Sequence, residues 1–530
     1  MSRQVVYHAG SHARQNSPTG MTATTISDAI PDAEASLGRR AAILITLTFT
    51  TMLYTMTVMI VNVALPKMQG TFAATTDQIA LVVTFNIVAT AVVTPISGWL
   101  ASRFSRRTLM LYCATGFTIS SVLCGVAGSL DQLVFYRILQ GGFGAPLVPL
   151  AQATILDTFP GKQRGTATAV FSMGVVFGPI IGPTVGGFLA EELGWRWVFF
   201  LLVPFGLLAI SCILVVIQDR RKAPIMRLDW FGFLLLAVAI GAFQLMLDRG
   251  QRLDWFDSPE IVAEAIIAAL CFYLFFAHIT TTTREPFLDL RIFADRNYAL
   301  GVVIIFLFGM VLWTPMVLLP PMMDGIQGYP EATIGLFIAL RGLGTLASSI
   351  VMAFINRLFD PRVLLTVGFV LQAIAGAFMA GFDVNLSPFA LAWTSLLAGF
   401  GVGLVWVPLT LITFATLNKA YLNEATAFYH LLRNIGSSIS ISLSIALVIQ
   451  SSSMIYADLV PFISIFGEAN SLMGLRGDWP TDGAGSLMTL SREIGRQSIM
   501  IGYTNAFWFY TVTAAAVIPF IWMVRKPDDR

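Results

Sequence analysis

Long apolar stretches are the feature that most constrains this chain. Fourteen segments of about 20 residues, the length that crosses the hydrocarbon core of a bilayer, recur along its 530 residues. They lie near 41–65, 79–101, 108–127, 132–157, 165–190, 197–217, 228–248, 261–280, 298–323, 332–356, 363–382, 388–416, 424–450 and 504–524. Charged residues make up only 12% of the chain, about half of their share in soluble domains. The sequence therefore predicts an all-α polytopic membrane protein with 14 transmembrane helices.

Basic residues are distributed unevenly over the loops between these segments. Most of them, such as Arg106 and Arg107, fall on one side if the N-terminus lies in the cytosol, as the positive-inside rule requires. We therefore expect both termini to be cytosolic. Residues 1–38 are polar without an apolar signal-peptide core, which predicts a disordered cytosolic tail, and 526–530 form a short second tail. On the opposite face, 451–503 is predicted to be a long periplasmic loop that is too broken to span, with room for short interfacial helices.

An internal repeat divides the chain into halves. LQGGFGAPLVPL at 139–150 is echoed by LAGFGVGLVWVPL at 397–409, and ATAVF at 167–171 by ATAFY at 425–429. SRFSRRTLML at 102–111 is echoed in the same order by NRLFDPRVLL at 356–365. Repeated halves with a site at their interface are the layout of secondary transporters. We predict an N-terminal six-helix bundle at 39–218, two inserted transmembrane helices with linkers at 219–283 and a C-terminal six-helix bundle at 284–525.

A stripe of glycines and prolines marks the fifth segment. Its members are Gly174, Gly178, Pro179, Gly182, Pro183 and Gly186. Residues four apart share one face of a helix, so the glycines leave a groove in which a second helix can approach closely. Each proline removes one backbone hydrogen bond, which neighbouring helices must replace in lipid. We expect a bent helix whose groove packs between the two halves and holds their closed interface; ordinary helix packing is the alternative.

Several motifs resemble those of a known family. GWLASRFSRR at 98–107, FYRILQGGFGAP at 135–146 and GVVFGPIIGPTVGG at 174–187 resemble motifs of the major facilitator superfamily, specifically its fourteen-span EmrB/QacA-type drug:proton antiporters. IVNVALP at 60–66 and RNIGSS at 433–438 are also similar, and the resemblance covers about 40–525. It implies the major facilitator fold, two six-helix bundles plus two inserted helices. It also assigns a conformational role to Gly98, Arg103 and Arg107 beside the glycine stripe.

The sequence departs from the family pattern at two places. The family usually has an aspartate in span 1, five residues before the Asn of its NVALP run, where this chain has Thr57. That aspartate is commonly assigned to proton coupling, so the resemblance supplies no such acid here. The usual Asp and Gly of the first-loop motif are Ser102 and Ser105, which weakens a charge-based latch at the cytosolic gate.

Ionisable side chains within the spans are candidates for proton coupling, because each costs about 2.5–3.5 kcal/mol at bilayer depth on insertion scales. The candidates are Asp324, Arg137, Glu424 and His430. We expect Asp324, in the repeat-mate of span 1, to replace the missing acid. Each candidate has a structural alternative. Asp324 could be a solvated acid at the outer end of its helix, and Glu424 could be favoured simply by its position at a helix N-terminus. Arg137 could donate hydrogen bonds between helices, and His430 could be an ordinary packing residue.

Spans 1, 4, 9 and 12 are expected to line the transport cavity, with contributions from 2, 5, 10 and 13. The candidate lining residues are Tyr54, Thr57, Asn62, Asn86, Gln140, Phe308, Trp313, Arg341, Trp406, Tyr429, Arg433 and Asn434. Aromatic faces with a few amides suit flat, apolar compounds, cations included. Ordinary packing explains each of these residues equally well.

The predicted function is secondary active efflux: export of lipophilic drugs or other small molecules across the bacterial inner membrane by proton antiport with alternating access. One alternative is an exporter or facilitator of an endogenous metabolite or anion with altered or absent proton coupling. Another is a receptor or scaffold that transports nothing. The sequence contains no nucleotide-binding loop, metal-ligand cluster or nucleophile elbow, so we predict no enzyme, cofactor or metal. In a cell with two membranes, the resemblance implies a periplasmic adaptor protein and an outer-membrane channel as partners. No basic run is dense enough to predict nucleic-acid binding.

Overall fold

The computed structural model describes residues 37–218, 228–282, 286–356, 358–462 and 484–525. The predicted tails lie outside them, except that the first helix already begins at Leu37. Within the described residues, 13 helices are long and apolar enough to cross a membrane, or up to 14 if one bent pair is a single span. The expected all-α polytopic architecture is therefore confirmed.

Nine helices build the first six predicted spans, because three spans are interrupted. The helices are α1 (Leu37–Phe72), α2 (Thr76–Val93), α3 (Ser97–Phe104), α4 (Arg106–Gly125), α5 (Leu130–Gly144), α6 (Leu147–Thr158), α7 (Gly161–Glu192), α8 (Arg196–Phe200) and α9 (Leu202–Val216). Pro95 and Pro146 fall in two of the interruptions, where the missing N–H ends the regular bonding. The first of these bends the second span by 58° between α2 and α3.

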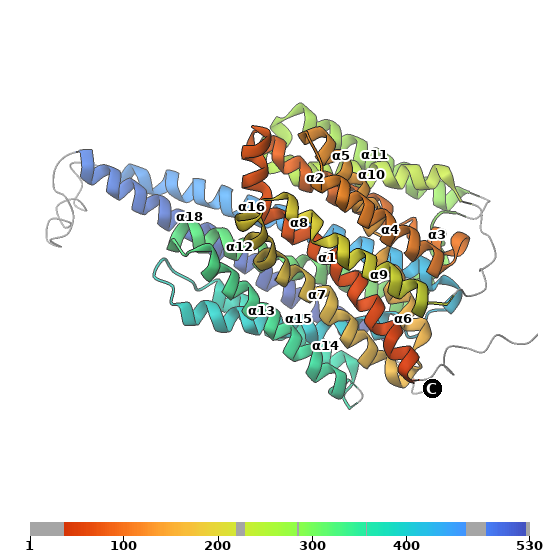
Figure 1. Cartoon of the computed structure of the whole chain (residues 1–530). Helices are drawn as coiled ribbons and strands as arrows, with labels where there is room; N and C mark the ends of the chain where they lie inside the picture. The colour runs from red at the N-terminus through yellow and green to blue at the C-terminus, as the bar shows by residue number, and fades with distance from the viewer. Residues whose placement is uncertain (1–36, 219–227, 283–285, 357, 463–483, 526–530) are drawn as a thin grey trace, which may run out of the picture.

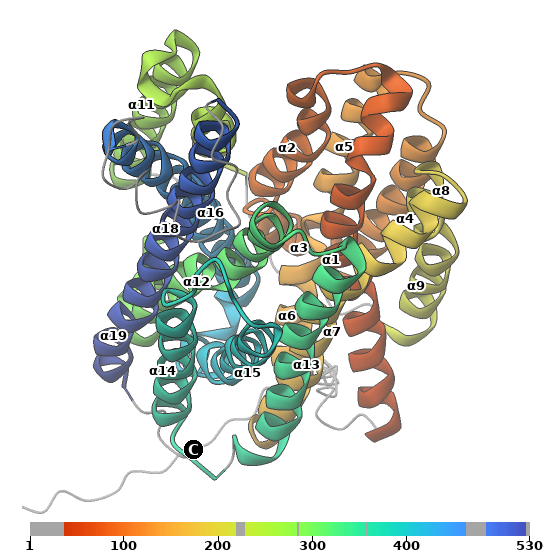
Figure 2. The ribbon, with the colours of Figure 1, turned by 90° about the vertical axis from the view of Figure 1, so that its left-hand side faces the viewer.

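The remaining spans are formed by nine further helices. These are α10 (Trp230–Arg249), α11 (Pro259–Thr281), α12 (Arg296–Gln327), α13 (Glu331–Ile355), α14 (Pro361–Met379), α15 (Pro388–Thr413), α16 (Leu422–Leu459), α18 (Ala484–Ala516) and α19 (Ile518–Met523). In Figure 2, α1 to α9 gather on one side and α12 to α19 on the other, with α7 and α13 side by side between them. The division into bundles at 39–218 and 284–525 stays a prediction.

The predicted loop at 451–503 is helical at both ends, which corrects our expectation. Helix α16 continues to Leu459, and α18 begins at Ala484. The two helices pack against each other, and the hydroxyls of Tyr456 and Ser491 lie 2.8 Å apart. This pairing stabilises helices whose mixed composition is too polar to predict a span. Figure 1 shows the pair projecting beyond the other helices.

The sequence repeat reappears in the packing at an offset of 258 residues. Gly178 on α7 lies against the backbone of α1, where an added Cβ would be 2.6 Å from the Met52 carbonyl oxygen. Its repeat-mate Gly436 on α16 lies in the same way against the Phe306 carbonyl of α12. The pairs α1–α7 and α12–α16 are thus the same close contact formed twice, once in each half.

Ser105, between α3 and α4, has φ +67° and ψ 153°. This region is essentially restricted to glycine and costs about 1–3 kcal/mol for other residues. Ser105→Gly is therefore expected to raise the midpoint of thermal unfolding in detergent by about 1–2 °C, since a glycine cap loses only a few tenths of a kcal/mol. Ser102→Gly, inside α3, is the matched control and should lower the midpoint. A lower midpoint for Ser105→Gly would contradict the strain.

Candidate functional site

A pocket lies near the middle of the helix bundle and contains about 600 Å³ of empty space, part of it open to solvent. Six predicted spans line it, through α1, α7, α12, α13, α15 and α16. The lining residues are Thr55, Val175, Val176, Pro179, Ile180, Leu312, Trp313, Met316, Ile338, Arg341, Gly342, Thr345, Val402, Trp406 and Arg433. The pocket therefore lies between the two halves and is mainly apolar.

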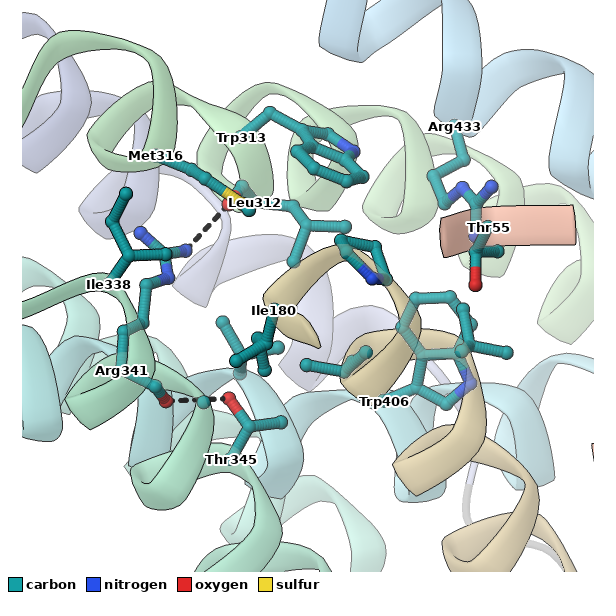
Figure 3. A pocket seen from close by; sticks show the side chains of 15 residues that line it. Thr55, Ile180, Leu312, Trp313, Met316, Ile338, Arg341, Thr345, Trp406 and Arg433 are labelled. Atoms are coloured by element: carbon teal, nitrogen blue, oxygen red, sulfur yellow. Dashed lines mark hydrogen bonds between the residues drawn. The ribbon is translucent and has the colours of Figure 1, made fainter. Parts of the chain in front are cut away.

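Two arginines reach this pocket from different helices, as Figure 3 shows. Arg341 on α13 is 7% exposed, and its Nη2 donates to the Leu312 carbonyl oxygen at 2.6 Å. Arg433 on α16 donates from Nη2 to Asn434 Oδ1 at 3.0 Å. Its guanidinium lies 5.2 Å from the ring centroid of Trp406, a cation–π distance. Each arginine thus has only part of its hydrogen-bonding capacity used by the protein.

Two of the fifteen residues that line the pocket are aromatic, and both are tryptophans. Trp406 stacks edge-on against Phe308, with centroids 5.9 Å apart, and Phe308 in turn contacts Phe369. Phe308 is fully buried, so it supports the wall without lining the pocket. Trp313 on α12 lines the pocket directly. Stacked rings hold Trp406 in one orientation, which keeps the pocket's shape fixed.

The glycine stripe of α7 does not pack between the halves, which corrects our expectation. An added Cβ at Gly174, Gly178, Gly182 or Gly186 would in each case meet α1, which belongs to the same half. The opposite face of α7 contacts the other half: Thr166 donates to the Ala353 carbonyl at 3.1 Å. A stripe of glycines predicts a close helix partner, but it does not identify which helix that partner is.

The halves meet at the end of the bundle where α1 begins and α19 ends, here called the terminal end. Arg106 at the start of α4 pairs with Asp157 at 3.0 Å and donates from Nε to Asn423 Oδ1 of α16 at 2.8 Å. Gly98 packs closely against the backbone of α16, since a Cβ added at Gly98 would lie only 2.8 Å from the Cα atom of Glu424. Arg106, which the motif-based choice of Arg103 and Arg107 missed, is therefore the arginine that joins the halves here.

Arg103, Arg107 and Glu424 lie around this contact in different environments. Arg103 is exposed. Arg107 donates to the Leu214 carbonyl at 2.8 Å, within its own half. Glu424 Oε1 accepts from the backbone N–H of Asp289 at 2.8 Å, which ties α16 to the segment that precedes α12. Their predicted roles stay predictions.

A buried hydrogen bond joins the halves between the terminal end and the pocket. His430 on α16 and Gln152 on α6 are 1% and 2% exposed, and Nε2 of the histidine lies 2.5 Å from Oε1 of the glutamine. Because that oxygen only accepts, the ring donates from Nε2. His430 Nδ1 and Gln152 Nε2 have no partner among the described residues. Tyr429 packs edge-on against the His430 ring and is itself buried.

Five of the predicted polar residues lie inside the first half and do not line the pocket. Arg137 is fully buried and donates to Gln140 Oε1 at 2.5 Å and to the Val82 carbonyl at 3.2 Å. Asn86 donates to the Arg137 carbonyl at 2.8 Å. Tyr54 lies 3.1 Å from the Thr90 hydroxyl, and Thr57 donates to the Leu53 carbonyl within α1. This cluster stabilises the contacts of α2 with α5.

Asp324 and Asn62 lie toward the other end of the bundle, here called the far end. Asp324 follows Trp313 by eleven residues on the same face of α12, about 16 Å further along the helix, and is exposed. Asn62 follows the pocket residue Thr55 by two turns of α1 and is also exposed. Neither lines the pocket.

Four of the twelve predicted cavity residues line the pocket: Trp313, Arg341, Trp406 and Arg433. Most residues that the sequence did not indicate are aliphatic, such as Val176 and Ile180 on α7. The sequence did contain a signal for these aliphatic residues, because they lie on the face of α7 opposite the glycine stripe. A helix that packs one face against α1 still presents its other face to a different neighbour.

Comparison with known proteins gives consistent matches. The Major Facilitator Superfamily model matches residues 47–441. The multidrug export protein EmrB of Escherichia coli (strain K12) is 32% identical over 479 residues, covering 88% of this chain and 92% of its own. The fatty acid resistance protein FarB of Neisseria gonorrhoeae is 31% identical over 474 residues, with the same coverage.

Solved structures share the fold. The proton:xylose symporter XylE, bound to 6-bromo-6-deoxy-D-glucose, superposes with a TM-score of 0.61, covering 92% of this chain and 95% of its own at 14% identity. The human organic anion transporter MFSD10 (TETRAN) gives 0.57, covering 90% and 99%, also at 14% identity. At this identity the likeness concerns the arrangement of helices alone.

Proposed function

Because the chain belongs to the major facilitator superfamily and is similar to multidrug export proteins along most of its length, we propose that it exports small, lipophilic drug-like molecules across the bacterial inner membrane. It is a multi-pass membrane transporter rather than an enzyme. The observation that carries the proposal is the apolar pocket between the halves, lined from both of them and closed off by contacts at the terminal end.

The arrangement corresponds to one state of an alternating-access cycle. Bonds between the halves gather on the terminal side of the pocket, from His430–Gln152 to Arg106–Asn423. With both termini in the cytosol, as the distribution of basic residues indicates, this is the outward-facing state. Opening the cytosolic side requires these bonds to break while the halves rotate about the pocket.

Export is tested by accumulation of a lipophilic dye in cells with and without the protein, before and after addition of an uncoupler. The expressing cells are expected to accumulate less dye, and the uncoupler should remove the difference. Equal accumulation at verified membrane levels of the protein, repeated with dyes of both charge signs, would contradict drug export and favour the export of an endogenous metabolite.

We propose that proton coupling acts through His430, with Asp324, Arg137 and Glu424 as the other candidates. The neutral ring donates to Gln152 across the halves. A second proton would occupy Nδ1, which has no acceptor among the described residues, and would add a charge one helical turn from Arg433. Both effects disfavour the closed terminal end, so a proton taken up in the outward-facing state would promote the return of the empty transporter.

His430→Asn is therefore expected to abolish efflux driven by a pH gradient in proteoliposomes while preserving exchange of substrate at equal pH. A merely structural histidine would affect both. Asp324→Asn is the matched comparison, because Asp324 is the acid that the sequence favours and it is exposed at the far end; if His430 alone carries the proton, this variant remains coupled. Coupling retained in His430→Asn and lost in Asp324→Asn would instead support the acid at the far end.

The proposed partners are a periplasmic adaptor and an outer-membrane channel. The projecting ends of α16 and α18 support an adaptor contact, since Met454 and Met488 are 68% and 66% exposed there. In a cell with two membranes, loss of the adaptor should abolish resistance but leave transport in proteoliposomes intact. Resistance that persists without any adaptor would contradict the partnership.

A further inference from the structure

The inserted helices α10 and α11 cover a seam between the two halves. Helix α10 contacts α2 of the first half and α16 of the second, and Figure 1 shows it beside α2. Ala91 on α2, Ile240 on α10 and Leu431 on α16 belong to one buried apolar cluster, and each is at most 2% exposed. Helix α11 packs on α10 and carries exposed side chains such as Tyr273 and Phe276. The pair therefore lies between the lipid and the line along which α2 meets α16.

Hydrogen bonds attach α10 to the second half at both of its ends. At the terminal end, Asp229 Oδ2 accepts from the backbone N–H of Phe287 at 3.2 Å, in the segment that leads into α12, and the rings of Phe233 and Phe287 lie 5.4 Å apart between centroids. At the far end, the Ser442 hydroxyl of α16 donates to the Leu247 carbonyl oxygen at 2.7 Å. Both Ser442 and Leu247 are buried, so breaking this bond would leave buried polar groups unpaired, which is costly. Helix α10 is thus attached to the second half over nearly its full length.

Contact with the first half is of a different kind. The Thr84 hydroxyl of α2 donates to the Asp248 carboxylate, and Arg252 Nη2 lies 3.4 Å from the same oxygen. The Asp248 side chain is 28% exposed, so water can take the place of Thr84. The Thr84 hydroxyl also lies 3.2 Å from the Ala80 carbonyl oxygen of its own helix, which offers a second acceptor. This bond can therefore break at little cost, because both groups keep a partner.

We propose that α10 and α11 move with the second half as one body and keep the seam with α2 covered, while the bond between Thr84 and Asp248 breaks and re-forms in each cycle. The inference rests on the rotation of the halves in the proposed export cycle. Such a rotation changes the separation of α2 and α16, and an uncovered gap at bilayer depth would admit lipid tails between the halves. The contact of α10 with α2 allows sliding, since an added Cβ at Gly241 would be 3.7 Å from Val92 Cγ2, an ordinary contact. A helix that stays bonded to α16 and slides on α2 keeps the gap filled.

Two pairs of cysteines at the same level of α10, in a background without the native cysteines, separate the two attachments. A short bifunctional methanethiosulfonate bridges α10 to the first half in Thr84→Cys with Asp248→Cys, and to the second half in Leu247→Cys with Ser442→Cys. Efflux of a lipophilic dye is measured before bridging, after bridging and after reduction, with the single-cysteine variants as controls. Bridging to the first half should abolish efflux until the bridge is reduced, whereas bridging to the second half should leave efflux at its unbridged rate. The reverse result would assign the pair to the first half and overturn the inference, as would the same effect of both bridges.

Distances between spin labels test the same motion without relying on export. Labels replace three exposed side chains: Tyr112 on α4 of the first half, Tyr273 on α11 and Phe378 on α14 of the second half. Arg106→Ala removes a bond between the halves at the terminal end and is expected to shift the protein toward its other state. The separation of positions 112 and 378 and that of 112 and 273 should then both change, while that of 273 and 378 stays fixed. A change between 273 and 378, or a fixed distance between 112 and 273 while 112 and 378 separate, would overturn the inference. Constant distances among all three labels would refute the rotation of the halves, and with it the proposed cycle itself.

Discussion

Replacing Gly178 by leucine is expected to abolish export while the protein still inserts into the membrane. An added Cβ at Gly178 would lie 2.5 Å from Thr55 Oγ1, 2.6 Å from the Met52 carbonyl oxygen and 2.9 Å from the Met56 amide nitrogen. Two of these atoms are backbone, so no side-chain rotation relieves the overlap. Helix α1 must move away from α7, and Thr55, which lines the pocket, moves with it.

Alanine substitutions on the same helix provide the matched pair. Gly178→Ala should lower export by about tenfold or more, because overpacking costs about 1–3 kcal/mol and each 1.4 kcal/mol is about a factor of ten. Gly187→Ala should export as the wild type does, since its Cβ would be 3.5 Å from Val63 Cγ1, an ordinary contact. The measurement is initial efflux rate per folded transporter. Equal rates for the two variants would show that the α1–α7 contact is not needed for transport.

Removing Arg106 is expected to have the second large effect. Arg106→Ala eliminates the ion pair with Asp157 and the bond to Asn423 that joins the halves. Charge-assisted bonds contribute about 1.5–3 kcal/mol each, so the closed terminal end should become about tenfold or more less populated. Efflux should fall accordingly, because a transporter that opens to the cytosol too readily returns its substrate there.

Labelling of a cysteine at position 172 reports the opening directly. The Ser172 hydroxyl is buried 3.5 Å from that of Ser349 in the other half, so Ser172→Cys should react faster from the cytosolic side in the Arg106→Ala background. Arg103→Ala is the control, since that arginine lies in the same motif but is exposed. Faster labelling in Arg103→Ala than in Arg106→Ala would restore the motif-based assignment.

The sequence predicted the number and order of the spans well, because a helix of about 20 apolar residues has the length needed to cross the hydrocarbon core of the bilayer. It predicted less well where helices are stabilised by one another. Tyr456 and Ser491 bond across α16 and α18, and this pairing extends both helices into residues too polar to be recognised as spans. Such contacts are formed between distant segments and leave no local signal.

The pocket was partly predictable for a similar reason. Arg341 and Arg433 were noticeable because charge is rare inside a membrane, and both line the pocket. Gln140 and Asn86 were equally noticeable, but they point toward Arg137 inside one half. Polarity indicates that a side chain needs partners; it does not indicate on which side of the helix they lie.

The two faces of α7 have a consequence for inhibition. The glycine face of α7 packs directly against α1, so we expect α1 and α7 to move as a single rigid wall, whereas Ile180 on the other face touches α13 at Gly342. A bulky compound that contacts both this wall and Trp313 would hold two moving bodies at a fixed separation. Such a compound would stop the transport cycle even if it is itself a poor substrate. The inhibitory potency of a series of compounds should therefore correlate with their width rather than with their affinity as transported substrates.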